Sequence, residues 1–405
     1  MSGSEAVKAI KLPEFVALFA LMTSLTALSI DAMLPALPEI AQNLSVTNAN
    51  DTQLVVSMFI LGMVFGESVF GPISDAIGRK KTILIGIAIY CCGAVLAMTA
   101  QSMTLLLVGR IVQGIGVSGP KIASRALIRD QYEGNAMARI MSFIMMIFII
   151  VPMVAPALGQ LILLFAGWRA IFFLFLLLAI TVAVWLGWRQ PETLPVERRI
   201  PFSIPAIIRT TGLVLKHSKV MAYTVTAGLV FGVQVTYLST SQAMFQDFYN
   251  AGKQFPLYFA ILALGIGMAS ILNSQLVMRI GMHRLTVNAL VGLIFLSCLL
   301  LLVGLLTEGV PPFSIFMPVF FLIFFCMGIL FGNINAMAMQ WLGRIAGLGA
   351  SLIASVSSLI AVAVSVSVGK FYNGTVFPLA IGYLVCAALA LLLVISANKS
   401  RLGEI

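Results

Sequence analysis

Long apolar runs recur through the whole chain, and they limit its fold more than any other feature. Each run is long enough to cross a bilayer as a helix, because about 20 apolar residues span the hydrocarbon core. Charged residues make up only 9% of the chain, whereas soluble domains carry about 25%. The sequence therefore predicts an all-α integral membrane protein.

Twelve spans can be counted, six on each side of a polar stretch. In the first half they lie near 14–37, 52–73, 82–100, 104–126, 137–164 and 168–188. In the second half they lie near 220–242, 256–278, 285–306, 313–339, 347–369 and 376–396. The predicted domains are a six-helix half at 1–188, a proline-rich and basic cytoplasmic linker at 189–219, and a second six-helix half at 220–405.

The basic residues predict the orientation of the spans. With both termini in the cytoplasm, nineteen of the 24 Lys and Arg residues fall in inward segments, and only Arg169, Lys253 and Lys370 fall in outward ones. Cytoplasmic loops next to spans are enriched in these cations. The net charge of +10 is therefore interpreted as an orientation signal, and no nucleic-acid partner is expected.

The two halves contain related turns. GPISDAIGRKKTI at 71–83 aligns with SQLVMRIGMHRLT at 274–286, which places Gly78 opposite Gly281. The second copy lacks the acid of the first. This repeat supports two six-helix halves related by pseudo-symmetry.

The first of these turns resembles the signature that major facilitator transporters carry between spans two and three. Its matching residues are Gly71, Asp75, Gly78, Arg79 and Lys80. Ala76 stands where a cation is common in the signature.

Two further spans extend the resemblance. LLLVGRIVQGIG at 105–116 is similar to the fourth-span pattern R-x-x-Q-G-x-G through Arg110, Gln113, Gly114 and Gly116. PMVAPALGQ at 152–160 is similar to the fifth-span antiporter pattern through Pro156 and Gly159, although Ala155 and Gln160 replace glycines there. The resemblance implies sealing or gating roles for Pro152, Pro156 and Gly159, and a simple membrane-helix kink is the alternative.

The first span narrows the resemblance. LSIDAMLPALPEI at 28–40 closely resembles the first span of the bicyclomycin/chloramphenicol (Bcr/CflA-type) drug:proton antiporters. The resemblance implies the major facilitator fold, with twelve transmembrane helices in two six-helix pseudo-symmetric halves. It also implies a monomer in the inner (plasma) membrane, whose partners are small amphipathic substrates, protons and membrane lipid.

Asp31, in the outer third of span one, is the strongest candidate site residue. A carboxylate inside a span costs a few kcal/mol and by default marks a proton or ion path. Asp31 precedes the helix-breaking Pro35 and Pro38. It is predicted to bind a proton and the substrate in exchange, and the alternative is a structural cap at a helix end.

Two other charged residues in the first half are candidates for proton coupling. Arg110 lies about 9 Å below the outer end of its span at 1.5 Å per residue. At a comparable depth to Asp31, it is hypothesised to pair with that carboxylate and relay substrate binding, or else to brace span four. Glu67 follows Gly62-x-x-x-Gly66, and is either a second proton or cation site or a neutral, hydrogen-bonded group that lines the cavity.

The acid of the cytoplasmic turn has a different predicted role. The resemblance implies that Asp75 approaches the positive end of span eleven, near 347–349, where a carboxylate is favoured. With Arg79 and Arg129 nearby, this contact would hold the halves closed on the inner side. The alternative is that the turn carries only an orientation signal.

Polar and soft side chains in the second half are candidates for substrate binding: Gln234, Tyr237, Asn273, Asn333 and Met337. They could line a mainly apolar cavity or form interhelical bonds. The predicted spans of this half contain no carboxylate, so proton coupling is assigned to the first half.

These features together predict a secondary transporter, not an enzyme. We expect proton-coupled efflux of small amphipathic drugs by alternating access; the alternative is export of a specific metabolite such as a nucleoside, amino acid or siderophore. The chain has no G-x-x-x-x-G-K-[ST] motif, so no P-loop is expected. No catalytic or metal site is predicted, the proton is the only expected coupling ion, and the five cysteines, all in apolar runs, are interpreted as core filler.

Overall fold

The computed structural model describes residues 12–132, 134–342 and 346–399, and its regular structure in these ranges is helical. The long helices are α1 (Leu12–Asp31), α3 (Leu54–Ile77), α4 (Arg79–Met98), α5 (Met103–Gln131), α6 (Gly134–Ala166), α7 (Trp168–Arg189), α9 (Ser218–Tyr249), α10 (Phe255–Ile280), α11 (Met282–Leu306), α12 (Phe313–Met339), α13 (Ala346–Gly369) and α14 (Phe377–Lys399). The short ones are η1 (Leu34–Ala36), α2 (Leu37–Asn43), η2 (Ala49–Gln53), η3 (Val196–Arg198), α8 (Ile204–Lys216) and η4 (Gly252–Gln254).

The twelve long helices match the twelve predicted spans. Among the described residues, eleven helical segments are long and apolar enough to cross a membrane, and α6 adds the shorter apolar stretch Ile150–Ala166. The all-α membrane fold is therefore confirmed. The predicted domain limits also include residues 1–11 and 400–405, which lie outside the described residues.

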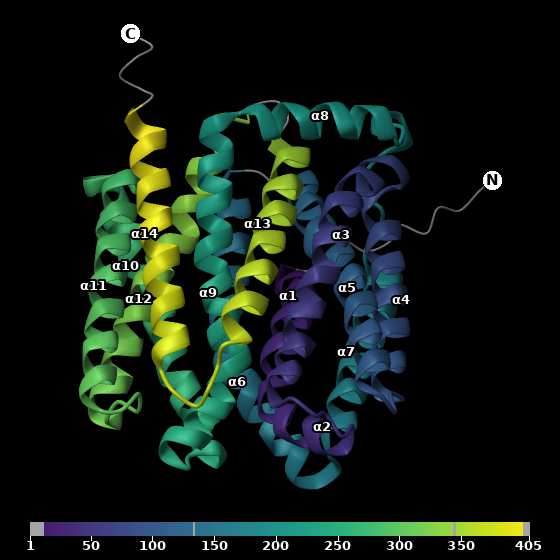
Figure 1. The fold of residues 1–405 in the computed structure, drawn as a ribbon. Coiled ribbons are helices and arrows are strands. Elements are labelled where there is room, and N and C mark those ends of the chain that lie inside the picture. Colours follow the sequence, from purple (N-terminus) through teal and green to yellow (C-terminus); the bar gives the residue numbers. More distant parts are fainter. Residues whose placement is uncertain (1–11, 133, 343–345, 400–405) are drawn as a thin grey trace, which may run out of the picture.

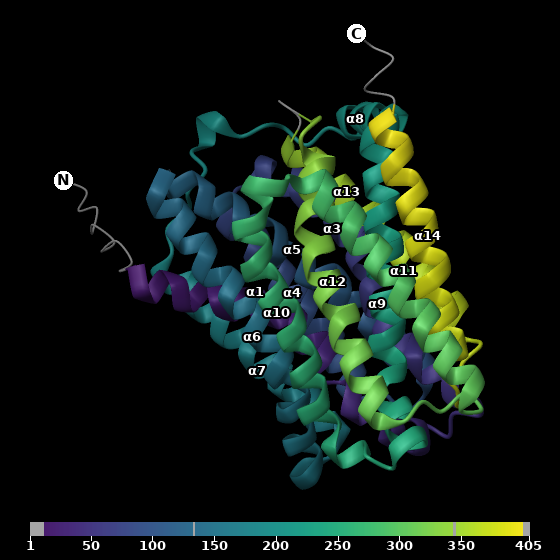
Figure 2. The same cartoon turned by 90° about the vertical axis from the view of Figure 1, so that its left-hand side faces the viewer.

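The helices form two groups of six. Figure 1 shows α1 and α3–α7, coloured purple to teal, mainly on the right, and α9–α14, green to yellow, on the left. Two long contacts join the groups, one between α3 and α13 and the other between α6 and α10. Figure 2 gives the view at right angles, in which the long helices again run together as one bundle. The two predicted six-helix halves are therefore present.

The linker contains a helix that the sequence interpretation missed. In Figure 1, α8 lies across the end of the bundle where α7 ends and α9 begins; this end is predicted to be cytoplasmic and is called the inner face below. Val214 is buried, and α8 packs against α9 and α13. Just before α8, the Ile200 N–H donates a hydrogen bond of 3.0 Å to the carbonyl of Asp75. The linker is thus attached to both halves.

Glycines allow α5 to pack very closely on its neighbours. A Cβ on Gly114 would lie 1.9 Å from the carbonyl oxygen of Phe59 in α3, and one on Gly116 would lie 2.2 Å from the backbone nitrogen of Tyr90 in α4. Such short distances exclude a side chain at either position. The fourth-span glycines therefore set the packing of α3, α4 and α5.

The cysteines are not uniformly buried. Cys386 is buried, but Cys92 and Cys298 are exposed on the helix surface. The prediction of five buried thiols is wrong for these two. A thiol behaves as a small hydrophobe, so the lipid-facing surface of a spanning helix accommodates it as well as the core does.

Candidate functional site

Asp31 ends α1, directly before η1 and α2. This break agrees with the helix end expected from the prolines. The residue is 5% exposed, and the following Ala32, Met33 and Leu34 are fully buried. Within the described part of the chain, the Asp31 carboxylate has no hydrogen bond or ion pair, so it does not act as a hydrogen-bonded cap. A buried carboxylate without a cation pays a high cost for its charge, and uptake of a proton removes that cost.

Arg110 does not pair with Asp31, so the predicted ion pair is wrong. Its buried guanidinium donates to the carbonyl oxygens of Ser29 at 2.7 Å and Val55 at 2.9 Å, and to Gln113 Oε1 at 3.1 Å. It also lies 4.4 Å from the ring centroid of Phe59. The depth of a residue along its span does not show how the helix is rotated about its axis. Arg110 contacts the backbone of Ser29, and the side chain of Asp31, two residues farther along, faces another direction on the helix. Arg110 therefore braces α1, α3 and α5.

Glu67 is fully buried at a contact between three helices. Its carboxylate forms an ion pair with Lys121 of α5, with Nζ 2.5 Å from Oε1. On the other side, Ser358 Oγ of α13 lies 3.5 Å from Oε2. The interpretation as a neutral group that only lines a cavity is therefore wrong, because a lysine holds this carboxylate. Sequence reasoning missed this partner, although Lys121 and Glu67 stand at similar depths in neighbouring spans.

The basic turn of the first half forms a network at the inner face. Gly78 has φ +107°, a conformation that side chains disfavour, and it joins α3 to α4. The Arg79 guanidinium bonds to Asp75 at 2.5 Å, to Asp130 at 3.0 Å and to Ser74 at 3.0 Å. These bonds tie the ends of α3, α4 and α5 together.

A carboxylate from the linker completes this network. Glu192 accepts hydrogen bonds from the backbone N–H groups of Arg79 at 2.8 Å and Lys80 at 3.2 Å. It therefore caps the start of α4, where a negative charge is favoured. Lys80 Nζ bonds to the carbonyl of Gly187 at 2.7 Å. Sequence reasoning did not assign a role to Glu192.

The expected contact between Asp75 and the start of α13 is not among the contacts of the described residues, and 343–345 lie outside them. The carboxylate instead pairs with Arg79 on its own side, because the i, i+4 spacing across the turn brings the two together. Among the contacts of the described residues, Arg129 is not part of the cluster. The motif does approach α13 at Gly71, where a Cβ would lie 2.8 Å from Ser351 Oγ.

At the opposite, outer face, η2 is bonded to the end of α13. Asn50 Nδ2 donates to the carbonyl of Tyr372 at 2.9 Å, and Gln53 Nε2 to that of Gly369 at 3.2 Å. Tyr372 in turn donates to Asp247 Oδ2 at 2.8 Å, and burial together with this carboxylate raises the pKa of Tyr372. These contacts close the outer end of the α3–α13 seam. No sequence pattern predicted these contacts, because isolated polar residues between two spans form no pattern.

The fifth-span motif lies in a continuous helix that passes directly under Asp31. Pro152 and Pro156 are both inside α6. A Cβ on Gly159 would lie 2.0 Å from the carbonyl oxygen of Ala32. Gly159 therefore lets α6 touch the backbone that follows Asp31, which places the motif next to the candidate carboxylate.

The second-half candidates separate into two kinds. Asn273 and Asn333 exchange two side-chain hydrogen bonds of 3.0 and 2.9 Å between α10 and α12, as the interhelical alternative predicts. Tyr237 is fully buried against the rings of Phe320 and Phe324, at centroid distances of 5.3 and 4.9 Å.

The remaining candidates of this half are also buried. Gln234 is 6% and Met337 is 4% exposed. Gln234 Oε1 and the Tyr237 hydroxyl have no hydrogen-bond partner in the described structure. These two polar atoms stay available as ligand contacts.

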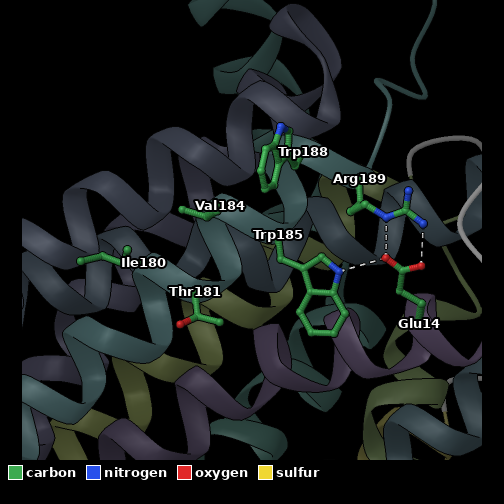
Figure 3. A pocket seen from close by; sticks show the side chains of 7 residues that line it. All are labelled: Glu14, Ile180, Thr181, Val184, Trp185, Trp188 and Arg189. Carbon is green, nitrogen blue, oxygen red and sulfur yellow. Dashed lines mark hydrogen bonds and ion pairs between the residues drawn. The ribbon is translucent and has the colours of Figure 1, made fainter. Parts of the chain in front are cut away.

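A recess of about 550 Å³ lies elsewhere, between α1 and α7. Figure 3 shows its lining residues: Glu14, Ile180, Thr181, Val184, Trp185, Trp188 and Arg189. Glu14 accepts bonds from Trp185 at 3.1 Å and from Arg189 at 2.7 and 2.8 Å. None of the predicted site residues lines this recess, and Trp188 is 84% exposed. Tryptophan and arginine at a helix end are typical of a membrane–water interface, so the recess is not the transport site.

Comparisons with known proteins agree with this architecture. The profile of the Major Facilitator Superfamily matches residues 19–369. The chain is 30% identical over 393 residues to the uncharacterized MFS-type transporter YdgK of Bacillus subtilis, covering 96% of each protein. It is 29% identical over 383 residues to the bicyclomycin resistance protein homolog of Haemophilus influenzae, covering 93% of this chain and 94% of that protein. The structure of a D-xylose-proton symporter superposes with a TM-score of 0.73 at 13% identity, over 94% of this chain and 97% of that one.

Proposed function

This chain belongs to the major facilitator superfamily and is a transporter rather than an enzyme, and we propose that it exports small amphipathic compounds in exchange for protons. The relative named for bicyclomycin resistance supports a drug as the exported compound. The proposal places the chain in the plasma membrane as a monomer, with both termini in the cytoplasm. Inward protons supply about 2.3 kcal/mol per charge for each 100 mV.

The observation that carries the proposal is the unpaired carboxylate of Asp31. It is buried at a helix break, no cation among the described residues pairs with it, and α6 packs against the next residue. The ionised carboxylate accepts a hydrogen-bond donor or cationic group of the substrate more strongly than the protonated form does, so proton binding and substrate binding oppose each other. This competition couples export of the compound to entry of the proton. Arg110 supports the coupling by fixing the backbone at Ser29, two residues earlier, and Glu67 is a second candidate for proton binding.

Gating residues support alternating access in the same proposal. The outer contacts of Asn50 and Gln53 with α13 close one end of the seam between the halves. The network around Gly78 and Arg79 holds the inner ends of the first half together. Export requires that the outer contacts break when the inner end closes. Tyr237 and Gln234 are the second-half contacts proposed for the substrate.

The test measures drug-driven proton movement in proteoliposomes that contain a trapped pH-sensitive dye. Bicyclomycin and chloramphenicol are added in turn to the wild type, to Asp31→Asn and to Asp51→Asn, the last of which changes an exposed acid of η2. Asp31→Asn is expected to reduce proton movement at least about tenfold, the factor that corresponds to 1.4 kcal/mol. Asp51→Asn is expected to match the wild type. Undiminished proton movement in Asp31→Asn would remove Asp31 from the mechanism.

A further inference from the structure

A row of cations on α5 is not balanced by acids. Lys121, Arg125 and Arg129 follow at four-residue spacing, so they share one face of the helix. Lys121 stands about 15 Å from the inner end of α5, at 1.5 Å per residue. Glu67 is an equal number of residues from the inner end of α3. The pair therefore lies well inside the span.

The charges around this pair leave one cation in excess. Glu67 bonds to Lys121 and also lies within electrostatic range of Arg125. Within the described residues, Arg125 has no hydrogen bond or ion pair. One carboxylate thus faces two cations.

Within the described residues, the other acids of the neighbouring helices lie or are engaged elsewhere, and Glu14 of α1 is paired with Arg189. Helix α13 contributes the hydroxyl of Ser358 and contains no charged residue over 346–369. Asp75 and Asp130 are both bound by Arg79 at the inner face, and the basic start of α4 adds only cations. Asp31 lies at the other end of α1. An unbalanced charge inside a span is costly, so an anion from outside the chain is favoured here.

Both cations are accessible. The Lys121 side chain is 26% exposed, and Arg125 is exposed. The guanidinium group binds carboxylates in a bidentate geometry, and the lysine ammonium adds a point charge. We propose that Lys121 and Arg125 bind an acidic group of the transported compound, so that amphipathic carboxylates are substrates. Glu67 then acts as the internal anion that the substrate displaces from Lys121. This inference rests on the proposed export function for its physiological direction.

The test uses two fluorescent probes that differ only in charge, dansylglycine and its neutral amide, with the full chain in lipid nanodiscs. The wild type is expected to bind the carboxylate about tenfold more tightly than the amide, which corresponds to one net charge contact. Neither Arg125→Gln nor Lys121→Arg removes a contact needed for folding. Arg125→Gln is expected to bring the ratio of carboxylate to amide affinity close to one, whereas Lys121→Arg is expected to preserve that ratio.

Substitution of Glu67 is expected to change dansylglycine binding in the direction opposite to Arg125→Gln. Glu67→Gln removes the internal competitor, so it is expected to tighten dansylglycine binding several-fold, whereas a purely structural ion pair would weaken binding or leave it unchanged. Arg129→Gln is the matched control one turn farther along the same face, with a change below about twofold. An absence of preference in the wild type, including binding of neither probe, overturns the inference. So does a preference that survives Arg125→Gln, or dansylglycine binding in Glu67→Gln that is weaker than in the wild type or unchanged.

The outcomes separate this inference from the proposed function. Drug-driven proton movement with no carboxylate preference removes the anion site and leaves the exporter. A carboxylate preference that follows Lys121, Arg125 and Glu67, without proton movement, leaves the anion site and removes the proton exchange.

Discussion

The two halves of the molecule share a fold but use buried polar groups differently. The first half buries charges: Asp31, Glu67 and Arg110 are at most 5% exposed. Apart from Lys219 at the start of α9, the polar groups that the described part of the second half buries are neutral, such as Gln234 and Asn333. This contrast supports the proposal that proton coupling belongs to the first half and that the second half contributes shape and hydrogen bonds to the substrate site.

Among the substitutions that test this contrast, the largest loss of stability is expected at Arg110. Arg110→Met removes three hydrogen bonds, of which two join α5 to α1 and α3 and one lies within α5. Each hydrogen bond to a charged group contributes about 1.5–3 kcal/mol, so we expect a loss of several kcal/mol and a large drop in melting temperature of the purified protein. Arg129→Met, on the same helix, is the control and should melt like the wild type. A normal melting temperature for Arg110→Met would show that the brace is not needed for folding.

The equivalent turns of the two halves give the next largest effect. Gly78 and Gly281 have φ +107° and +86°, in a region that only glycine occupies easily, at a cost of about 1–3 kcal/mol for other residues. A Cβ on Gly78 would also lie 2.4 Å from Glu192, whereas one on Gly281 meets nothing within 4 Å. Gly78→Ala should therefore lower the melting temperature more than Gly281→Ala. Equal losses would mean that Glu192 moves aside freely.

The amide pair of the second half should matter less than the charges of the first. Hydrogen bonds between membrane helices average about 0.6 kcal/mol, so Asn333→Ala should cost about 1 kcal/mol. The double variant with Asn273→Ala should lose no more than the single one, because the two residues bond to each other. Melting curves of the three variants test this, and additive losses would reveal other partners.

The smallest change in stability is expected at Tyr237. Its hydroxyl has no partner in the described structure, so Tyr237→Phe should leave the free energy of unfolding within about 0.5 kcal/mol of the wild type. Transport should still fall if this hydroxyl binds substrate. Tyr383→Phe is the control, since its hydroxyl is buried and unpartnered as well but is not a proposed ligand. Equal transport by both variants would exclude Tyr237 as a substrate contact.

Local features of the fold could be predicted from the sequence. The rotation of each helix about its axis, and the pairing of residues far apart in the chain, could not. The spans follow from the length of apolar runs, and the glycine turns at Gly78 and Gly281 follow from turn chemistry. The partners of Arg110 depend on how three helices are rotated, which depth alone does not give. Helix α8 had a readable signal, because its apolar residues recur at helical spacing, but the prolines around it obscured this pattern.

The attachment of the linker to both halves has a consequence for the range of the transport cycle. Ile200 is bonded to Asp75 on one half, and α8, which begins at Ile204, rests on α9 and α13 of the other. The four Cα steps between these points extend to roughly 14 Å at most. The linker therefore acts as a short tether. The two halves can separate at the inner face, beside α3 and α13, only until the tether is fully extended, and any wider opening requires that one of its ends first detaches from the bundle.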